Sequence, residues 1–217
     1  MNISEIFASI DGEGPRSGKL ATFIRTHACP LRCTYCDSLY AVEGSDFKVM
    51  SVDEILSEVN KIGITNVTLT GGEPLIQKDA YELVNRLAGK GYEVQIETSG
   101  AVDYSPYLQT PYFLRSNILV TADWKCPSSG MEDKMIPGLI EKLRFVDVLK
   151  FVVGSEEDLE RMRELSTKTN AQVYVSPVFG KVEPKRIVEY MLEHKLQNVK
   201  FQLQAHKIVW EPDMRGV

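Results

Sequence analysis

The sequence predicts an α/β fold: an incomplete parallel (β/α) barrel, formed by a single domain over residues 1–217. Two observations support this prediction. Strand-like segments alternate with helical or mixed segments, which is typical of βαβ units and a mainly parallel sheet. The chain is also shorter than the roughly 250 residues of a full eight-fold barrel. Repeated right-handed crossovers would therefore wind toward a barrel of reduced size.

The strands are predicted from short β-branched and apolar segments bounded by glycine and polar residues. They fall at 20–26, 66–70, 92–97, 117–122, 147–153, 172–176 and 198–204. The two segments 101–116 and 124–137 show neither the two-residue alternation of a strand nor the 3.6-residue period of a helix, so we expect irregular connections there.

The helices are predicted from apolar periodicity and from their end signals. Ser51 and Glu54 match a capping box, which starts a helix that Gly63 would end. Ser155 is expected to cap another helix, and Pro184 lies near the start of a third. These two helices are expected at about 156–168 and 184–195, and a further helix at about 77–88.

Polar motifs follow the predicted strands at the point where each strand ends. They are the cysteine loop after residue 26, Gly71-Gly72-Glu73-Pro74, Glu97-Thr-Ser-Gly100, Asp123-Trp-Lys125, Ser176-Pro177 and His206-Lys207. In a parallel sheet the carboxyl ends of the strands share one face, which is where barrel enzymes place their chemistry. The sequence therefore predicts one active site on this face.

Composition excludes some classes of partner. Lys and Arg number 25 and Asp and Glu number 30, so the net charge is −5 and nucleic acid is an unexpected main partner. No run approaches the roughly 18 apolar residues of a membrane span. The N-terminus, Met1-Asn2-Ile3-Ser4-Glu5, has no basic flank or apolar signal core, so a cytosolic location without a membrane partner is expected.

The strongest chemical signal is the segment Cys29-Pro-Leu-Arg-Cys33-Thr-Tyr-Cys36. Clustered thiolates in a reducing compartment indicate a metal site rather than a disulfide framework. Three thiolates suit an iron–sulfur cluster with one open iron. With His27 as a fourth ligand they would also suit zinc, so both remain possible from spacing alone. Cys126 lies outside this group and is expected to be a small buried thiol.

The C-x3-C-x2-C spacing, with Tyr35 before the last cysteine, resembles the signature of the radical S-adenosylmethionine superfamily. The resemblance implies that Cys29, Cys33 and Cys36 hold a 4Fe–4S cluster whose open iron binds S-adenosylmethionine. Reductive cleavage then gives a 5′-deoxyadenosyl radical. Thr70-Gly-Gly-Glu-Pro74 resembles the second motif of this superfamily, in which Gly71, Gly72 and Glu73 would meet the methionine amino group.

A narrower resemblance covers almost the whole chain. Its segments are Glu5–Gly14, Phe23–Arg25, Cys36–Ser38, Ile96–Gly100, Ser176–Phe179 and Ala205–Trp210, and they resemble the 7-carboxy-7-deazaguanine synthase family. Members of that family convert 6-carboxy-5,6,7,8-tetrahydropterin to 7-carboxy-7-deazaguanine by ring contraction with loss of ammonia. The resemblance implies a reduced radical S-adenosylmethionine barrel, magnesium, a homodimer and an electron donor such as flavodoxin or ferredoxin.

The same resemblance implies roles for particular residues. The pterin would be bound by Asp11, Gly12, Glu13, Arg25, Thr70 and His206. S-adenosylmethionine would be bound by Tyr35, Glu97, Ser99, Asp123 and Lys125. Magnesium would be bound by Ser38. Arg25 would pair with the substrate carboxylate. Asp11 stands where the family usually carries glutamine.

Other interpretations remain open at this point. A glycyl-radical activating enzyme would share the cysteine and Gly-Gly-Glu-Pro motifs, although it gives no reason for Glu5–Gly14. A non-enzymatic zinc or iron–sulfur module is the third possibility. Considered singly, Arg25 could face solvent, Glu97 could be a structural carboxylate, and Ser38 could cap its loop.

Overall fold

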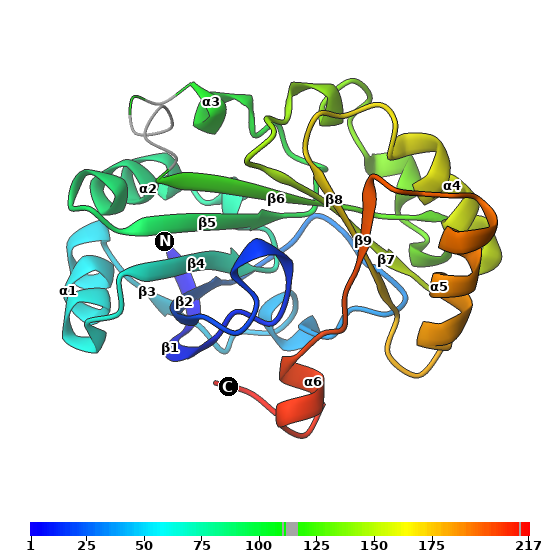
Figure 1. Ribbon diagram of the computed structural model, residues 1–217. Helices are drawn as coiled ribbons and strands as arrows, with labels where there is room; N and C mark the ends of the chain where they lie inside the picture. The colour runs from blue at the N-terminus through cyan, green and yellow to red at the C-terminus, as the bar shows by residue number, and fades with distance from the viewer. Residues whose placement is uncertain (110, 112–116, 213) are drawn as a thin grey trace.

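The computed structural model describes residues 1–109, 111, 117–212 and 214–217. Within them the strands form one nine-stranded sheet in the order β3-β1-β2-β4-β5-β6-β7-β8-β9 (Figure 1). The strands are β1 (Asn2–Ile10), β2 (Leu20–Thr26), β3 (Lys48–Val49), β4 (Asn66–Gly71), β5 (Glu93–Thr98), β6 (Ile118–Trp124), β7 (Val148–Val153), β8 (Gln172–Pro177) and β9 (Val199–Phe201).

The sheet is mostly parallel and does not close. The run from β2 through β4 to β9 is parallel throughout, whereas β1 pairs antiparallel with both β2 and β3. Since β3 and β9 end the strand order without pairing with each other, the predicted incomplete barrel is confirmed.

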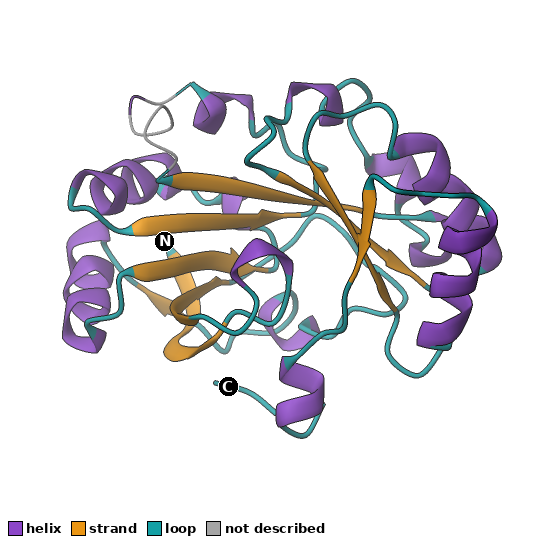
Figure 2. Ribbon diagram, viewed as in Figure 1, coloured by secondary structure: helices purple, strands orange, loops and turns teal. Residues whose placement is uncertain are grey.

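The longer helices lie at the periphery of the sheet (Figure 2). They are α1 (Val52–Ile62), α2 (Ala80–Gly89), α4 (Glu156–Leu165) and α5 (Pro184–Glu193), with short α3 (Ser105–Leu108) and α6 (His206–Val209). Helix α2 packs on β5, α4 on β7, and α5 on β8 and β9. None of the helices in the described part of the chain combines the length and apolarity that crossing a membrane requires.

The predicted helix ends are confirmed by the capping geometry. Ser51 and Glu54 form a reciprocal capping box at the start of α1, and Gly63 ends that helix in the left-handed region with a φ of 76°. At α4 the hydroxyl of Ser155 accepts a hydrogen bond from the Asp158 backbone N–H. Each cap satisfies a helix-end group that would otherwise lack a partner.

All seven predicted strands are present, but two others, β1 and β3, were missed. β1 is partly exposed along most of its length, so it lacks the clean two-residue alternation that marks a strand. The last strand ends at Phe201 rather than at residue 204, and beyond it the side-chain amides of Gln202 and Gln204 donate hydrogen bonds to Glu13. Of the expected irregular segment 101–116, residues 110 and 112–116 lie outside the described residues.

The hydrophobic core lies between the sheet and its helices. Apolar side chains from the central strands β4 to β8 pack against those of α1, α2 and α4. Ile55, Leu69, Leu83, Ile96 and Leu149 are among the largest side chains that are completely buried. This packing fixes the central strands, and with them the positions of the polar residues at their carboxyl ends.

Candidate active site

One cavity of about 260 Å³ lies where the parallel strands end. It is lined by most of the residues that the sequence singled out: Gly12, Glu13, Arg25, Cys29, Cys33, Tyr35, Cys36, Ser38, Thr70, Gly71, Gly72, Glu97, Ser99, Asp123, Lys125 and His206. Asp11 and Glu73 are the two predicted site residues that do not line it.

The cysteine loop, which follows β2, is hydrogen-bonded to β7 and to the segment after β6. The phenol of Tyr35 donates a hydrogen bond of 3.2 Å to the Val152 carbonyl at the end of β7. The backbone N–H of Thr34 donates to the Ser129 carbonyl at 3.0 Å, and its hydroxyl to the Ser128 carbonyl at 2.8 Å. These bonds join a loop that follows β2 to segments that follow β6 and β7. The loop therefore has a defined place over the cavity.

Gly71 and Gly72 have no room for a side chain, because neighbouring backbone atoms lie too close. A Cβ atom on Gly72 would lie 2.3 Å from the Ala28 carbonyl oxygen and 3.0 Å from Cys29 Cβ. A Cβ atom on Gly71, whose φ is 139°, would lie 2.3 Å from the Thr26 carbonyl oxygen. The glycines let β4 and its turn approach the base of the cysteine loop. Both glycines also line the cavity.

The three cysteines of the loop are free thiols that are partly exposed to the cavity. Burial raises the pKa of Cys29 and of Cys33, and the ammonium of Lys125 opposes the rise in both. Among the described residues, no group of three His, Cys, Asp or Glu side chains is arranged to hold a single metal ion. Thiolates are the usual protein ligands of a four-iron cluster, so the three cysteines fit that group by their chemistry.

His27 is directed away from the thiols. Its ring stacks on Phe47 with a centroid distance of 4.5 Å, and its Nδ1 lies 3.3 Å from the Ser4 hydroxyl. His27 does not line the cavity. The zinc arrangement with His27 as fourth ligand is therefore not supported.

Glu73 is fully buried behind the cavity wall. Its carboxylate accepts hydrogen bonds from the Ser99 backbone N–H at 2.8 Å, the Ser99 hydroxyl at 2.6 Å and the Thr98 hydroxyl at 2.9 Å. Burial raises the pKa of Glu73 and these donors oppose the rise. The carboxylate thus holds the end of β5, including the cavity residue Ser99.

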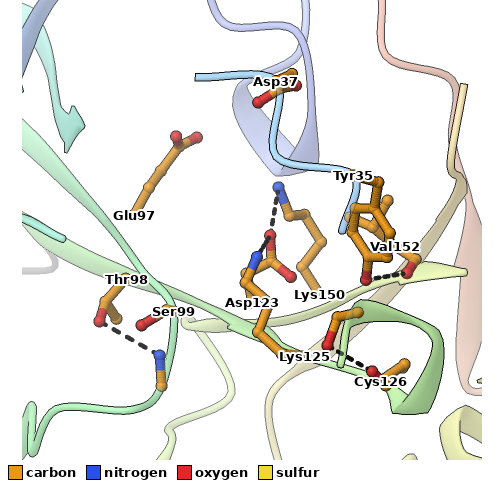
Figure 3. Close-up of polar contacts among 12 residues, drawn as sticks. Tyr35, Asp37, Glu97, Thr98, Ser99, Asp123, Lys125, Cys126, Lys150 and Val152 are labelled. Atoms are coloured by element: carbon orange, nitrogen blue, oxygen red, sulfur yellow. Dashed lines mark hydrogen bonds and ion pairs between the residues drawn. The ribbon is translucent and has the colours of Figure 1, made fainter. Parts of the chain in front are cut away.

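A chain of opposite charges crosses the floor of the cavity. Lys150 Nζ lies 3.0 Å from Glu13 Oε2 and 3.2 Å from Asp123 Oδ2, and Lys125 Nζ lies 3.0 Å from that same Asp123 oxygen. Figure 3 shows Asp123 between the two lysines. Burial raises the pKa of Asp123, but the two lysines outweigh it and hold that pKa below its ordinary value. Asp123 is therefore an anion at neutral pH.

Glu13 and Glu97 have further partners around this chain. Glu13 also accepts hydrogen bonds of 3.0 Å from the Ser176 hydroxyl and from the Gln202 amide. Glu97 accepts one of 2.9 Å from the Thr70 hydroxyl, and burial raises its pKa. On β6, Thr121 Oγ1 and Asp123 Oδ1 are buried and have no hydrogen-bond partner among the described residues. These two atoms are free to bind a polar ligand.

Arg25 enters the cavity from β2 with one side of its guanidinium already paired. Its Nε donates to Glu5 Oε1 at 2.7 Å, and the Tyr40 phenol donates to that same oxygen at 2.6 Å. Only 18% of the Arg25 side-chain surface is exposed. Arg25 therefore does not simply face solvent, and its terminal N–H groups are available to an anionic ligand.

The C-terminal segment also lines the cavity, through His206 and Lys207 of α6. A Cβ atom on Gly12 would lie 2.2 Å from His206 Nδ1, so glycine at position 12 leaves room for this ring. Lys207 pairs with Asp37 at 2.9 Å, and the Ser38 hydroxyl donates to Asp37 at 3.0 Å. Burial lowers the pKa of His206, although Glu13 and Asp37 oppose the effect.

Asp11 is buried and surrounded by protein side chains, and it does not line the cavity. It pairs with buried Arg16 at 2.7 Å and accepts a hydrogen bond of 2.7 Å from the Thr68 hydroxyl. Arg16 in turn donates to the Glu93 carbonyl at 3.1 Å. This buried cluster anchors the loop that carries Gly12 and Glu13.

Sequence reasoning missed Lys150, Asp37 and Tyr40 as cavity residues, whereas Lys207 belongs to the His206-Lys207 motif that was placed on this face. A usable signal existed for one of them, because Lys150 is the only charged residue in the strand sequence VLKFVV. A lysine within such a buried strand requires partners. The others lie in loops or short helices, whose sequences do not indicate which way a side chain points.

Comparisons with known proteins agree with this geometry. Residues 23–108 match the family model "Radical SAM superfamily". The chain is 42% identical to the 7-carboxy-7-deazaguanine synthase of Clostridium acetobutylicum, over 99% of this chain and 98% of that one. It is 38% identical to the synthase of that name from Methanospirillum hungatei, over 98% of this chain and 86% of the relative.

Solved structures agree as well. The crystal structure of QueE from Escherichia coli matches with a TM-score of 0.75 and 25% identity, over 94% of each chain. Streptococcus suis SuiB bound to S-adenosylmethionine shares the fold with a TM-score of 0.54 and 15% identity, over 83% of this chain and 46% of that one. These matches do not favour a glycyl-radical activating enzyme. By its nearly full-length identity with these relatives, the chain belongs to the 7-carboxy-7-deazaguanine synthase family of the radical S-adenosylmethionine superfamily.

Proposed function

We propose that this protein converts 6-carboxy-5,6,7,8-tetrahydropterin to 7-carboxy-7-deazaguanine, with ring contraction and loss of ammonia. The observation that carries the proposal is that one cavity brings together three free thiols, the guanidinium of Arg25 and the carboxylate of Glu13. The relatives that bear the name of this activity match the chain almost from end to end.

The family implies two cofactors, a 4Fe–4S cluster and S-adenosylmethionine. When bound, they would supply the 5′-deoxyadenosyl radical that removes hydrogen from the substrate carbon bearing the carboxylate. Cys29, Cys33 and Cys36 would hold the cluster, and Tyr35 would keep their loop in place through Val152.

The S-adenosylmethionine site would lie along the ends of β4 to β6. Ser99, Asp123 and Lys125 would bind polar groups of this ligand, together with Glu97. Gly71 and Gly72 would form the adjoining wall. Since the Glu73 carboxylate is fully engaged, we expect it to act by orienting Ser99 rather than by direct contact.

The pterin would lie between the N-terminal loop and α6. Arg25 would bind the substrate carboxylate with its free N–H groups. Glu13 would accept hydrogen bonds from the nitrogen-rich edge of the pterin, and Thr70 and His206 would bound the ring. Asp11 would contribute through its ion pair with Arg16 rather than by touching the substrate.

Magnesium would bind beside Ser38. Asp37 supplies an adjacent carboxylate with about half of its side chain exposed; desolvation would raise its pKa, but the Lys207 ammonium outweighs this and holds the pKa low, so Asp37 stays anionic. A magnesium ion keeps several waters and takes few protein oxygens. One hydroxyl and a nearby carboxylate, with oxygens of the substrate, are a sufficient site.

We also propose a single-domain homodimer in the cytosol that takes electrons from a flavodoxin or ferredoxin.

The test is an anaerobic reaction of the reconstituted protein with S-adenosylmethionine, dithionite, magnesium and 6-carboxytetrahydropterin, with mass spectrometry of the products. We expect 7-carboxy-7-deazaguanine, and less of it when magnesium is chelated. Deoxyadenosine without the deazapurine would reject the substrate. Neither product from protein with an intact cluster would reject the enzymatic function.

A further inference from the structure

Lys150 lines the cavity and forms ion pairs with two of its carboxylates. It lies in the middle of β7, and only 11% of its side-chain surface is exposed. Its ammonium contacts two carboxylates on opposite sides of the cavity floor, Glu13 at 3.0 Å and Asp123 at 3.2 Å.

These two carboxylates belong to different ligand subsites. Glu13 extends from the N-terminal loop, where it is bound by Ser176 and Gln202, and would meet the pterin. Asp123 ends β6, where it is bound by Lys125, and would meet S-adenosylmethionine. Lys150 links them, whereas Lys125 pairs with Asp123 alone among the described carboxylates.

The charge balance of the floor depends on this link. The described groups there are the carboxylates of Glu13, Glu97 and Asp123 and the ammoniums of Lys125 and Lys150. Burial lowers the pKa of Lys150, but Asp123, Glu13 and Glu97 together raise it well above its ordinary value. Without Lys150, three buried acids would share one cation, and both Glu13 and Asp123 would lose the contact that orients them.

We propose that Lys150 is a positioning residue that serves both ligand subsites, holding Glu13 for the pterin and Asp123 for S-adenosylmethionine. This inference rests on the proposed function, which places the two ligands at those carboxylates. The consequence that distinguishes this proposal is that one substitution on β7 weakens the binding of two ligands, each measured separately.

The experiment measures binding of each ligand alone to the reconstituted holoenzyme, anaerobically and without reductant, so that no turnover occurs. Equilibrium dialysis with labelled S-adenosylmethionine gives one Kd, and ultrafiltration with 6-carboxytetrahydropterin gives the other. Lys150→Met removes the charge at nearly constant volume. Lys125→Met tests the neighbouring lysine. Lys200→Met is the matched control, because Lys200 is an exposed lysine on the nearby strand β9.

We expect Lys150→Met to raise both Kd values about tenfold or more, as the loss of one partner of a buried charge pair does. Lys125→Met should raise the Kd for S-adenosylmethionine alone, and Lys200→Met should change neither. Lys150→Gln, which keeps a hydrogen-bond donor, serves if the methionine variant does not fold.

An effect of Lys150→Met on only one ligand, or on neither, would overturn the proposal. So would loss of folding in both Lys150 variants while the other two fold, since Lys150 would then be a structural residue. Wild-type protein that binds S-adenosylmethionine but not the pterin would instead defeat the proposed function, and this proposal with it.

Discussion

Arg25 shows how a single residue acquires its role from its neighbours. Glu5 takes the Nε side of the guanidinium, and Tyr40 supports Glu5 through the same oxygen. This pairing turns the remaining N–H groups toward the cavity. The position of Arg25 four residues before Cys29 suggested the role, but its partners Glu5 and Tyr40 come together only in the folded chain.

Replacement of Arg25 by lysine should raise the KM for the pterin by about 10- to 100-fold, because an ammonium cannot make a bidentate pair with a carboxylate. The Kd for S-adenosylmethionine should not change. Arg163→Lys is the control, since Arg163 is an exposed residue of α4, outside the cavity, that pairs with Glu160. An unchanged KM in Arg25→Lys would remove the carboxylate contact from the account.

Glu97 gives a prediction about pH at the same scale. Burial, with Asp11 and Glu13 nearby, raises its pKa above the ordinary 4.5, and Lys150 and Thr70 oppose the rise. The folded state therefore binds this proton more tightly than the unfolded state. The stability that it contributes is present below about pH 4.5 and is lost as pH rises through the raised pKa.

Glu97→Gln, which cannot ionise, should thus gain stability relative to wild type as the pH rises from 4 to 8. Urea unfolding at each pH measures the difference in free energy of unfolding. Glu141→Gln, at an exposed position, should show no such trend. A difference between Glu97→Gln and wild type that stays flat or narrows with rising pH would contradict the raised pKa.

At the scale of elements, local signals predicted the helices well. Ser51, Glu54 and Gly63 mark the ends of α1 because capping depends on side chains within a few residues. β1 and β3 were missed because they form an antiparallel edge that is set by pairing with β2 and not by their own pattern. The need for Gly71 and Gly72 was anticipated, but its cause, the approach of the cysteine loop, is a long-range contact.

Gly72→Ala should displace the cysteine loop, because the new Cβ would lie 2.3 Å from the Ala28 carbonyl oxygen. We expect lower iron content after reconstitution and a loss of about 1–3 kcal/mol in the free energy of unfolding, as overpacking causes. Gly138→Ala is the comparison variant: it adds left-handed backbone strain at a φ of 76° but no clash, because nothing lies within 4 Å of its Cβ position, so it should leave the iron content unchanged. Normal iron content in Gly72→Ala would show that the loop tolerates the shift.

At the scale of the whole molecule, the cavity is closed by the two ends of the chain. The loop after β1 carries Glu13, and α6 carries His206 against Gly12. Lys207 fixes α6 to Asp37 in the cysteine loop, and Arg215 lies 3.7 Å from the centre of the Tyr40 ring. Sequence analysis could place the motifs at strand ends, but it could not show that the C-terminal segment supports both the pterin subsite and the cysteine loop.

Lys207→Met should loosen α6 and raise the KM for the pterin several-fold, while the Kd for S-adenosylmethionine stays unchanged. The cause is that α6 would lose its ion pair of 2.9 Å with Asp37. Lys181→Met, at an exposed lysine outside the cavity, is the matched control. An equal change in both variants would show that α6 does not depend on this pair.

The central claim is that this cavity holds 6-carboxytetrahydropterin so that a radical derived from S-adenosylmethionine removes its hydrogen at the carbon bearing the carboxylate. The most direct measurement uses that substrate with deuterium at this carbon, in an anaerobic reaction followed by mass spectrometry. The account predicts 7-carboxy-7-deazaguanine together with 5′-deoxyadenosine that carries the deuterium. Unlabelled deoxyadenosine, or label transfer without the deazapurine, would contradict it.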